Sequence, residues 1–148
     1  MTKILISIIP LALIVVIACK KEDSIVQQNI ILKDKPLAEI KAHIEGAWQF
    51  HHSVGGFTGQ ATFYYKNSYI DFRTNDSLFW VDDAQERAKT KINWIRAKDV
   101  YGDSTYILSF YDVYNFPESW VVEGIEKDSL ILRDNGADGF IHYLIKRD

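Results

Sequence analysis

The alternation of apolar and polar residues divides the chain into three parts. An apolar run, a polar stretch and a short helical pattern fill residues 1–47, and from Trp48 onward apolar residues recur at every second position. A period of two is typical of strands that are buried on one face. The pattern therefore predicts an all-β domain behind an N-terminal leader.

Nine runs from Trp48 onward are rich in aromatic and β-branched residues, as strands are. They cover residues 48–54, 60–65, 69–73, 77–81, 90–97, 105–110, 119–125, 129–133 and 140–146. The connections are too short for crossover helices, so neighbouring strands should pair antiparallel in an up-and-down meander. We expect the meander to close into a barrel of about eight strands, with a two-sheet sandwich as the alternative. The polar stretch Asp82–Lys89 is predicted to be a loop or a short helix.

One short helix is predicted immediately before the strands. Asp34 is a candidate N-cap, Pro36 suits a first turn, and Gly46 suits the C-terminal end. The helix carries one apolar stripe, made of Leu37, Ile40 and Ile44. This stripe should cover an apolar part of the barrel.

The apolar run Ile4–Ile17 follows Lys3 and is too short for a membrane-spanning helix, which needs about 20 residues. Its length and basic flank are typical of a signal peptide. The run ends in Val16-Ile17-Ala18-Cys19, which resembles the lipobox of bacterial lipoproteins and contains the only cysteine of the chain. The resemblance implies cleavage before Cys19 and attachment of lipid to its thiol.

The predicted organisation is a signal peptide over residues 1–18, a lipidated cysteine with its tether over 19–35, and a barrel domain over 36–148. Lys20–Ser24 resembles the signal, a lysine followed by acidic residues, that sends some lipoproteins to the outer face of the outer membrane. A solvated tether is the alternative for that segment. Ile30-Ile31-Leu32 is too apolar for a spacer and is expected to dock on the domain.

The junction of helix and first strand, Gly46-Ala47-Trp48, resembles the Gly-x-Trp motif of lipocalins and related calycin barrels. The resemblance implies that Trp48 closes one end of the barrel and that a cation from the last strand, Arg147 or Lys146, stacks on it. It also implies a function in binding a small apolar or amphipathic ligand. We take Trp80, Trp94 and Trp120 as candidate walls of the ligand site.

Charge and residue type exclude several other functions. With 17 basic and 20 acidic residues the chain has no basic excess for nucleic acid. His51 and His52 are neighbours on a predicted strand, where they should point to opposite faces and so cannot share a metal. We therefore expect no metal, no cofactor and no catalytic constellation. A non-catalytic module that binds a protein of the cell envelope is the alternative function.

Overall fold

The computed structural model describes residues 29–147. The predicted signal peptide, Cys19 and the first part of the tether lie outside the described residues. Within residues 29–147 no helix has the length and apolar character needed to cross a membrane.

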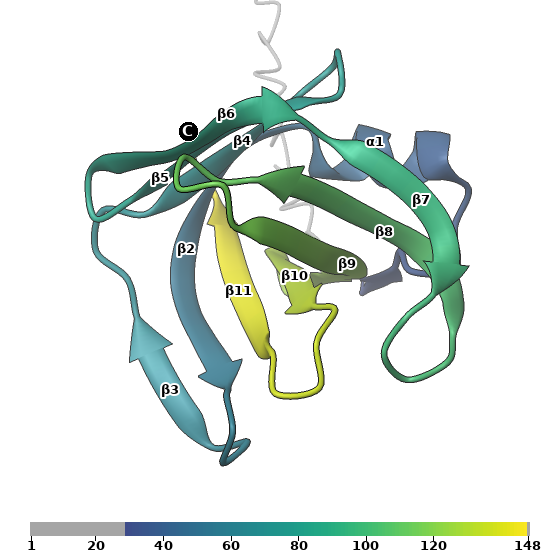
Figure 1. Ribbon diagram of the computed structural model, residues 1–148. Coiled ribbons are helices and arrows are strands. Elements are labelled where there is room, and N and C mark those ends of the chain that lie inside the picture. The colour runs from purple at the N-terminus through teal and green to yellow at the C-terminus, as the bar shows by residue number, and fades with distance from the viewer. Residues whose placement is uncertain (1–28, 148) are drawn as a thin grey trace, which may run out of the picture.

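The chain forms one short helix and a strongly curled antiparallel sheet (Figure 1). The path through the sheet is β6-β5-β4-β2-β11-β10-β9-β8-β7, while β1 pairs with β9 and β3 with β2. The elements are β1 (Ile30–Ile31), α1 (Leu37–Ile44), β2 (Gly46–Gly55), β3 (Ala61–Tyr64), β4 (Tyr69–Arg73), β5 (Ser77–Asp82), β6 (Gln85–Lys91), β7 (Asn93–Lys98), β8 (Ser104–Tyr111), β9 (Pro117–Glu126), β10 (Ser129–Asp134) and β11 (Phe140–Lys146). The predicted all-β meander with one N-terminal helix is confirmed, in the form of a half-barrel.

The sheet joins its first and last long strands but opens in the middle of the chain. β2 pairs with β11 along seven positions, from Trp48 with Lys146 to Gly55 with Phe140. β6 and β7 follow each other in sequence, joined only by Ile92, yet they lie at the two ends of the sheet path. We call this unpaired junction of β6 and β7 the seam.

The seam corrects two sequence predictions. Residues 90–97 do not form a single strand, because the chain bends at Ile92, whose N–H donates to the Asp76 carbonyl instead. Residues 82–89 are not a loop or a helix, because most of them belong to β6. Asp83 and Ala84 both adopt positive φ (47° and 63°), as the two-residue hairpin turn before β6 requires. Aspartate accepts this conformation but alanine rarely does, so the Asp83-Ala84 pair is a weak turn signal in sequence.

Helix α1 covers one end of the half-barrel, where Ile40 and Ile44 are buried in the core. The helix is preceded by Pro36 as N-cap and has no side-chain cap, so the prediction that Asp34 is the N-cap was wrong. The predicted docking of Ile30–Leu32 is confirmed: β1 pairs with β9, and Leu32 is completely buried.

On the outer face of β9 and β10, Arg133 forms a buried ionic cluster. Its guanidinium contacts the carboxylates of Asp99 and Glu123 and lies 4.7 Å from the ring centre of Tyr101. Burial would raise the pKa of Asp99, but backbone N–H groups and Arg133 hold it below its ordinary value. The cluster fastens the loop between β7 and β8 to the outside of the sheet.

Replacing Arg133 by Met should leave Asp99 buried without its cation. Removing one partner of a buried pair costs about 3–5 kcal/mol, so we expect R133M to lower the free energy of unfolding at pH 7 by about 3 kcal/mol in urea denaturation. Ionised Asp99 contributes stability above its unfolded pKa, and this is lost as pH falls through its lowered folded pKa. The deficit of R133M should therefore shrink below about pH 4.

The matched control for this prediction is Arg96→Met, because Arg96 is exposed on β7, lies over the ring of Tyr106 and has no carboxylate partner among the described residues. R96M should unfold like the parent protein. An equal loss in both variants, or a deficit of R133M that does not change with acid, would contradict the role of the cluster.

Candidate functional site

The inside of the half-barrel away from α1 is filled by aromatic rings. Trp80 and Trp120 lie 5.5 Å apart between ring centres in an edge-to-face arrangement, and Phe110 contacts both of them. Phe50 packs against the same two tryptophans. Two of the three predicted ligand walls, Trp80 and Trp120, therefore come together, but they pack against each other.

A chain of hydrogen bonds crosses the same region. His142 has Nδ1 2.6 Å from Ser53 Oγ and Nε2 2.9 Å from Asp134 Oδ1, and the Ser53 hydroxyl donates to Tyr65 Oη at 3.0 Å. The order of residue types is that of a nucleophile, a base and an acid. Ser53 is completely buried, however, so a substrate has no access to its hydroxyl in this structure. The chain satisfies buried polar groups and stabilises the end of the half-barrel.

Asp134 is the negative end of this chain. Burial would raise its pKa, but His142, the backbone N–H of Phe140 and the Trp120 indole N–H lower it below the ordinary value. Asp134 begins the segment Asp134–Gly139, which joins β10 to β11 in a hairpin. Within residues 29–147 no group of three His, Cys, Asp or Glu side chains is placed to hold a metal ion.

The carboxyl group of Glu118, on β9, has a pKa above its ordinary value. Burial raises the pKa of its carboxyl, and the charges of Asp134 and Asp112 raise it further. The carboxyl groups of Asp134 and Glu118 therefore have pKa values displaced in opposite directions. Asp134 accepts several hydrogen bonds, whereas Glu118 is mainly desolvated.

The loop between β8 and β9 lies beside β6 at the seam. The Arg87 guanidinium of β6 lies between the rings of Trp80 and Tyr114, 5.4 and 5.1 Å from their centres. It donates to Asp112, whose side chain is fully buried, at 3.0 Å. The N–H of Val113 donates to the Arg87 carbonyl at 2.7 Å. The loop between β8 and β9 thereby takes the place of a missing strand beside β6.

At the α1 end, Trp48 is buried and its indole N–H donates to the Ile44 carbonyl at 2.7 Å. The cation above its ring is Lys146, 4.4 Å from the ring centre. Arg147 lies instead over Tyr69, at 4.0 Å. Of the two cations considered from sequence, Lys146 is therefore the one on Trp48. Gly46 has φ of +99°, a conformation that favours glycine.

The third predicted wall, Trp94, lies elsewhere, in a groove of about 320 Å³ between α1 and the seam. We call this hollow the α1 groove. Buried apolar side chains of Ile44, Phe72 and Ile92 line it beside Trp94. Its other lining residues are Ala38, Lys41, Ala42, Glu45, Arg73, Thr74 and Asp76.

Two polar features mark the α1 groove. The Trp94 indole nitrogen is buried and has no hydrogen-bond partner. Lys41 lies 5.8 Å from the Trp94 ring centre and forms an ion pair with Asp76 at 2.6 Å. The groove thus combines an apolar floor, a charged rim and one unsatisfied donor, which is the composition of a small-molecule site.

Comparison with protein-family models, with curated proteins and with solved structures finds no match for this chain.

The prediction that His51 and His52 point to opposite faces was wrong. The pairing of β2 with β11 shifts register between Phe50 and His52, which makes His51 the extra residue of a β-bulge. Both imidazoles consequently lie together, with Nδ1 atoms 2.8 Å apart. His142, by contrast, is buried inside the half-barrel.

Sequence reasoning missed Ser53, Tyr65, Arg87 and Glu118. Alternation from Trp48 and Phe50 places Ser53 on the outer face of the strand, and only the bulge at His51 turns it inward, so its burial could not be predicted. The other three are ordinary strand or loop residues in sequence, and only the curling of the sheet brings them together.

Replacing Glu118 by Gln should stabilise the protein at pH 7. A carboxyl whose folded pKa is raised favours folding when protonated, and this contribution is lost as pH rises through the folded pKa. The denaturation midpoint of E118Q should exceed that of the parent at pH 7 and approach it near pH 4. Glu126→Gln, at the exposed end of the same strand, is the control and should show no such pH dependence. A destabilised E118Q at pH 7 would show that the ionised carboxylate is needed for the fold.

Proposed function

We propose that this protein is a membrane-anchored lipoprotein whose lipocalin-like barrel binds a small amphipathic ligand in the α1 groove. The observation that carries the proposal is the buried indole N–H of Trp94, unpartnered beside an apolar hollow of about 320 Å³. Small-molecule sites have volumes of roughly 300–1,000 Å³ and few polar groups, so the groove suits a ligand at the small end of that range.

The Trp94 N–H defines one part of the ligand. A buried donor without an acceptor costs about 1–3 kcal/mol, and a ligand oxygen placed against it would recover much of that cost. The floor formed by Ile44, Phe72 and Ile92 would contact an apolar body. The rim carries two cations, Lys41 and Arg73, and two carboxylates, Glu45 and Asp76, so it suits a polar head group that accepts a hydrogen bond.

The address of the protein is proposed from its sequence. Lipidation of Cys19, export to the outer membrane through Lys20–Ser24 and exposure at the cell surface would place the barrel on a short tether. β1 is the point where that tether meets the domain, because Ile30 and Ile31 pair with β9. More than one acyl chain would give stable anchoring without a membrane-spanning helix.

A second candidate, a module that binds an envelope protein, is favoured by one surface. The end of β8 and the loop between β8 and β9 expose several apolar side chains beside the seam. These are Tyr111, Val113, Tyr114 and Phe116, each more than half exposed. Clustered exposed apolar groups mark interaction sites more often than scattered ones do. Recovery of a stoichiometric protein partner, with no ligand in the α1 groove, would favour this function.

The anchor is tested by lipid labelling. Cells expressing the full chain and supplied with labelled palmitate should yield labelled protein in the membrane fraction. The Cys19→Ser variant should be unlabelled, because its hydroxyl is not a substrate for thioether formation. Label on the C19S variant, or none on the parent, would contradict the anchor and leave the groove hypothesis intact.

Two variants test the α1 groove. One removes the Trp94 N–H, and the other fills the groove. Dodecanoate, titrated by displacement of a fluorescent naphthylamine probe, should bind the parent protein. Trp94→Phe keeps an aromatic ring but removes the N–H together with the five-membered ring of the indole, so affinity should fall about five- to tenfold, the value of one hydrogen bond. Ala42→Leu fills the groove and should abolish binding of both dodecanoate and the probe.

The control for these variants is Ile95→Ala, which truncates an exposed neighbour of Trp94 on the other face of β7. Thermal unfolding checks that each variant is folded. Binding that is unchanged in both W94F and A42L would place the ligand elsewhere.

A further inference from the structure

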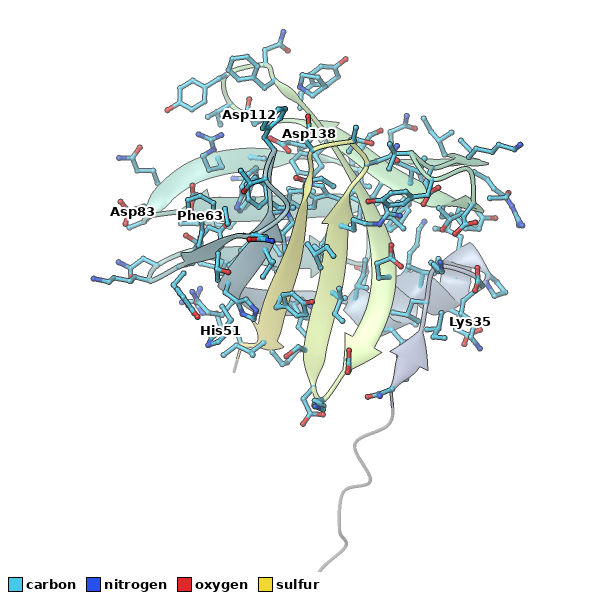
Figure 2. The ribbon with its side chains drawn as sticks, turned by 90° about the horizontal axis from the view of Figure 1, so that it is seen from below. Lys35, His51, Phe63, Asp83, Asp112 and Asp138 are labelled. Atoms are coloured by element: carbon cyan, nitrogen blue, oxygen red, sulfur yellow. The ribbon has the colours of Figure 1, made fainter. Side chains whose placement is uncertain are left out.

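The bulge in β2 places two histidine side chains next to each other on the outside of the sheet. Adjacent strand residues normally point to opposite faces. Here His51 and His52 have ring centres 5.0 Å apart, and both approach Tyr64. The pair lies away from the α1 groove, and His51 is at the edge of the molecule (Figure 2).

The separation of the two nitrogens matches a chelate. Two ligands at about 2.0 Å from one metal lie about 2.8 Å apart in a square-planar arrangement and about 3.3 Å apart in a tetrahedral one. The Nδ1 atoms of His51 and His52 are 2.8 Å apart. In the absence of metal the same distance permits one ring to donate a hydrogen bond to the other.

The His52 ring is held by aromatic neighbours, and the His51 ring is open to solvent. His52 is stacked on Tyr143, with ring centres 4.5 Å apart and planes 3° apart, and has Tyr64 near its other side. Burial and the neighbouring His51 lower the pKa of His52 below its ordinary value. His51 is exposed, which leaves the pair accessible to an ion from solvent.

We propose that His51 and His52 form a two-nitrogen site for a divalent transition-metal ion that favours tetragonal geometry, Cu²⁺ above all. Imidazole suits copper, nickel and zinc rather than magnesium or calcium, and affinity is highest for Cu²⁺ across the first-row series. Each ring carries its proton on Nε2 when Nδ1 binds the ion. No third His, Cys, Asp or Glu of residues 29–147 completes the site, so water or an external ligand takes the remaining positions.

The site is tested with Cu²⁺ and the full chain carrying Cys19→Ser, which removes the competing thiol from every sample. Calorimetry at pH 7.4 should show one equivalent of Cu²⁺ that is absent from the His51→Gln, His52→Gln double variant. The second imidazole of a chelate acts at an effective concentration of about millimolar, so either single variant should bind about 100-fold more weakly. Electron paramagnetic resonance should show a tetragonal Cu²⁺ signal with splitting from two imidazole nitrogens.

His43→Gln is the matched control, because His43 lies on α1, and it should keep the full equivalent. Zn²⁺ should bind more weakly than Cu²⁺. Thermal unfolding establishes that the double variant is folded. A double variant that retains the equivalent, or a parent signal without nitrogen splitting from two imidazoles, would overturn the proposal.

Discussion

The missing ladder between β6 and β7 is the constraint on which the rest of the structure depends. Every other consecutive pair of strands from β4 to β11 is hydrogen-bonded, and β2 pairs with β11. Unpaired backbone groups at a seam have to be satisfied or left to water. The protein satisfies one of them with a local substitute, because Val113 of the β8–β9 loop donates to the Arg87 carbonyl of β6. The N–H of Ile92 instead extends the β5–β6 pairing by donating to Asp76. At the seam, a loop thus takes the place of a strand.

The open seam and the helix beside it determine which part of the half-barrel is packed and which part is hollow. Away from α1, the half-barrel is packed by large aromatic rings and a satisfied chain of polar groups, so a ligand would have to displace Trp80 or Trp120 to enter. Beside the seam, α1 lies across the bend at Ile92 without filling the space beneath it. A helix with small residues on that side, Ala38 and Ala42, leaves room that larger side chains would occupy. The hollow follows from this local sequence and from the bend together.

Much of the fold could be predicted because the alternation of apolar and polar residues can be read within each short segment of the chain. The strands after Trp48, the helix before it and the docking of Ile30–Leu32 all follow from residue patterns within a few positions. The bend at Ile92, the turn at Asp83-Ala84 and the bulge at His51 do not, because each depends on what the neighbouring strand offers. A bulge reverses the face of every later residue on its strand, which is why the predicted opposition of His51 and His52 was wrong. Among the three tryptophans predicted as ligand walls, sequence could not separate Trp94, which lines the α1 groove, from the packed pair Trp80 and Trp120.

The tryptophans also show why the α1 groove differs from ordinary packing. A buried indole N–H normally finds an acceptor, and two others in this domain do: Trp48 donates to Ile44, and Trp120 to Asp134. Trp94 lies close to the same helix as Trp48, yet its N–H has no acceptor. A phenylalanine would fill a purely structural position there without the cost of an unsatisfied donor. In the proposed function, the ligand in the α1 groove supplies the acceptor that this indole lacks.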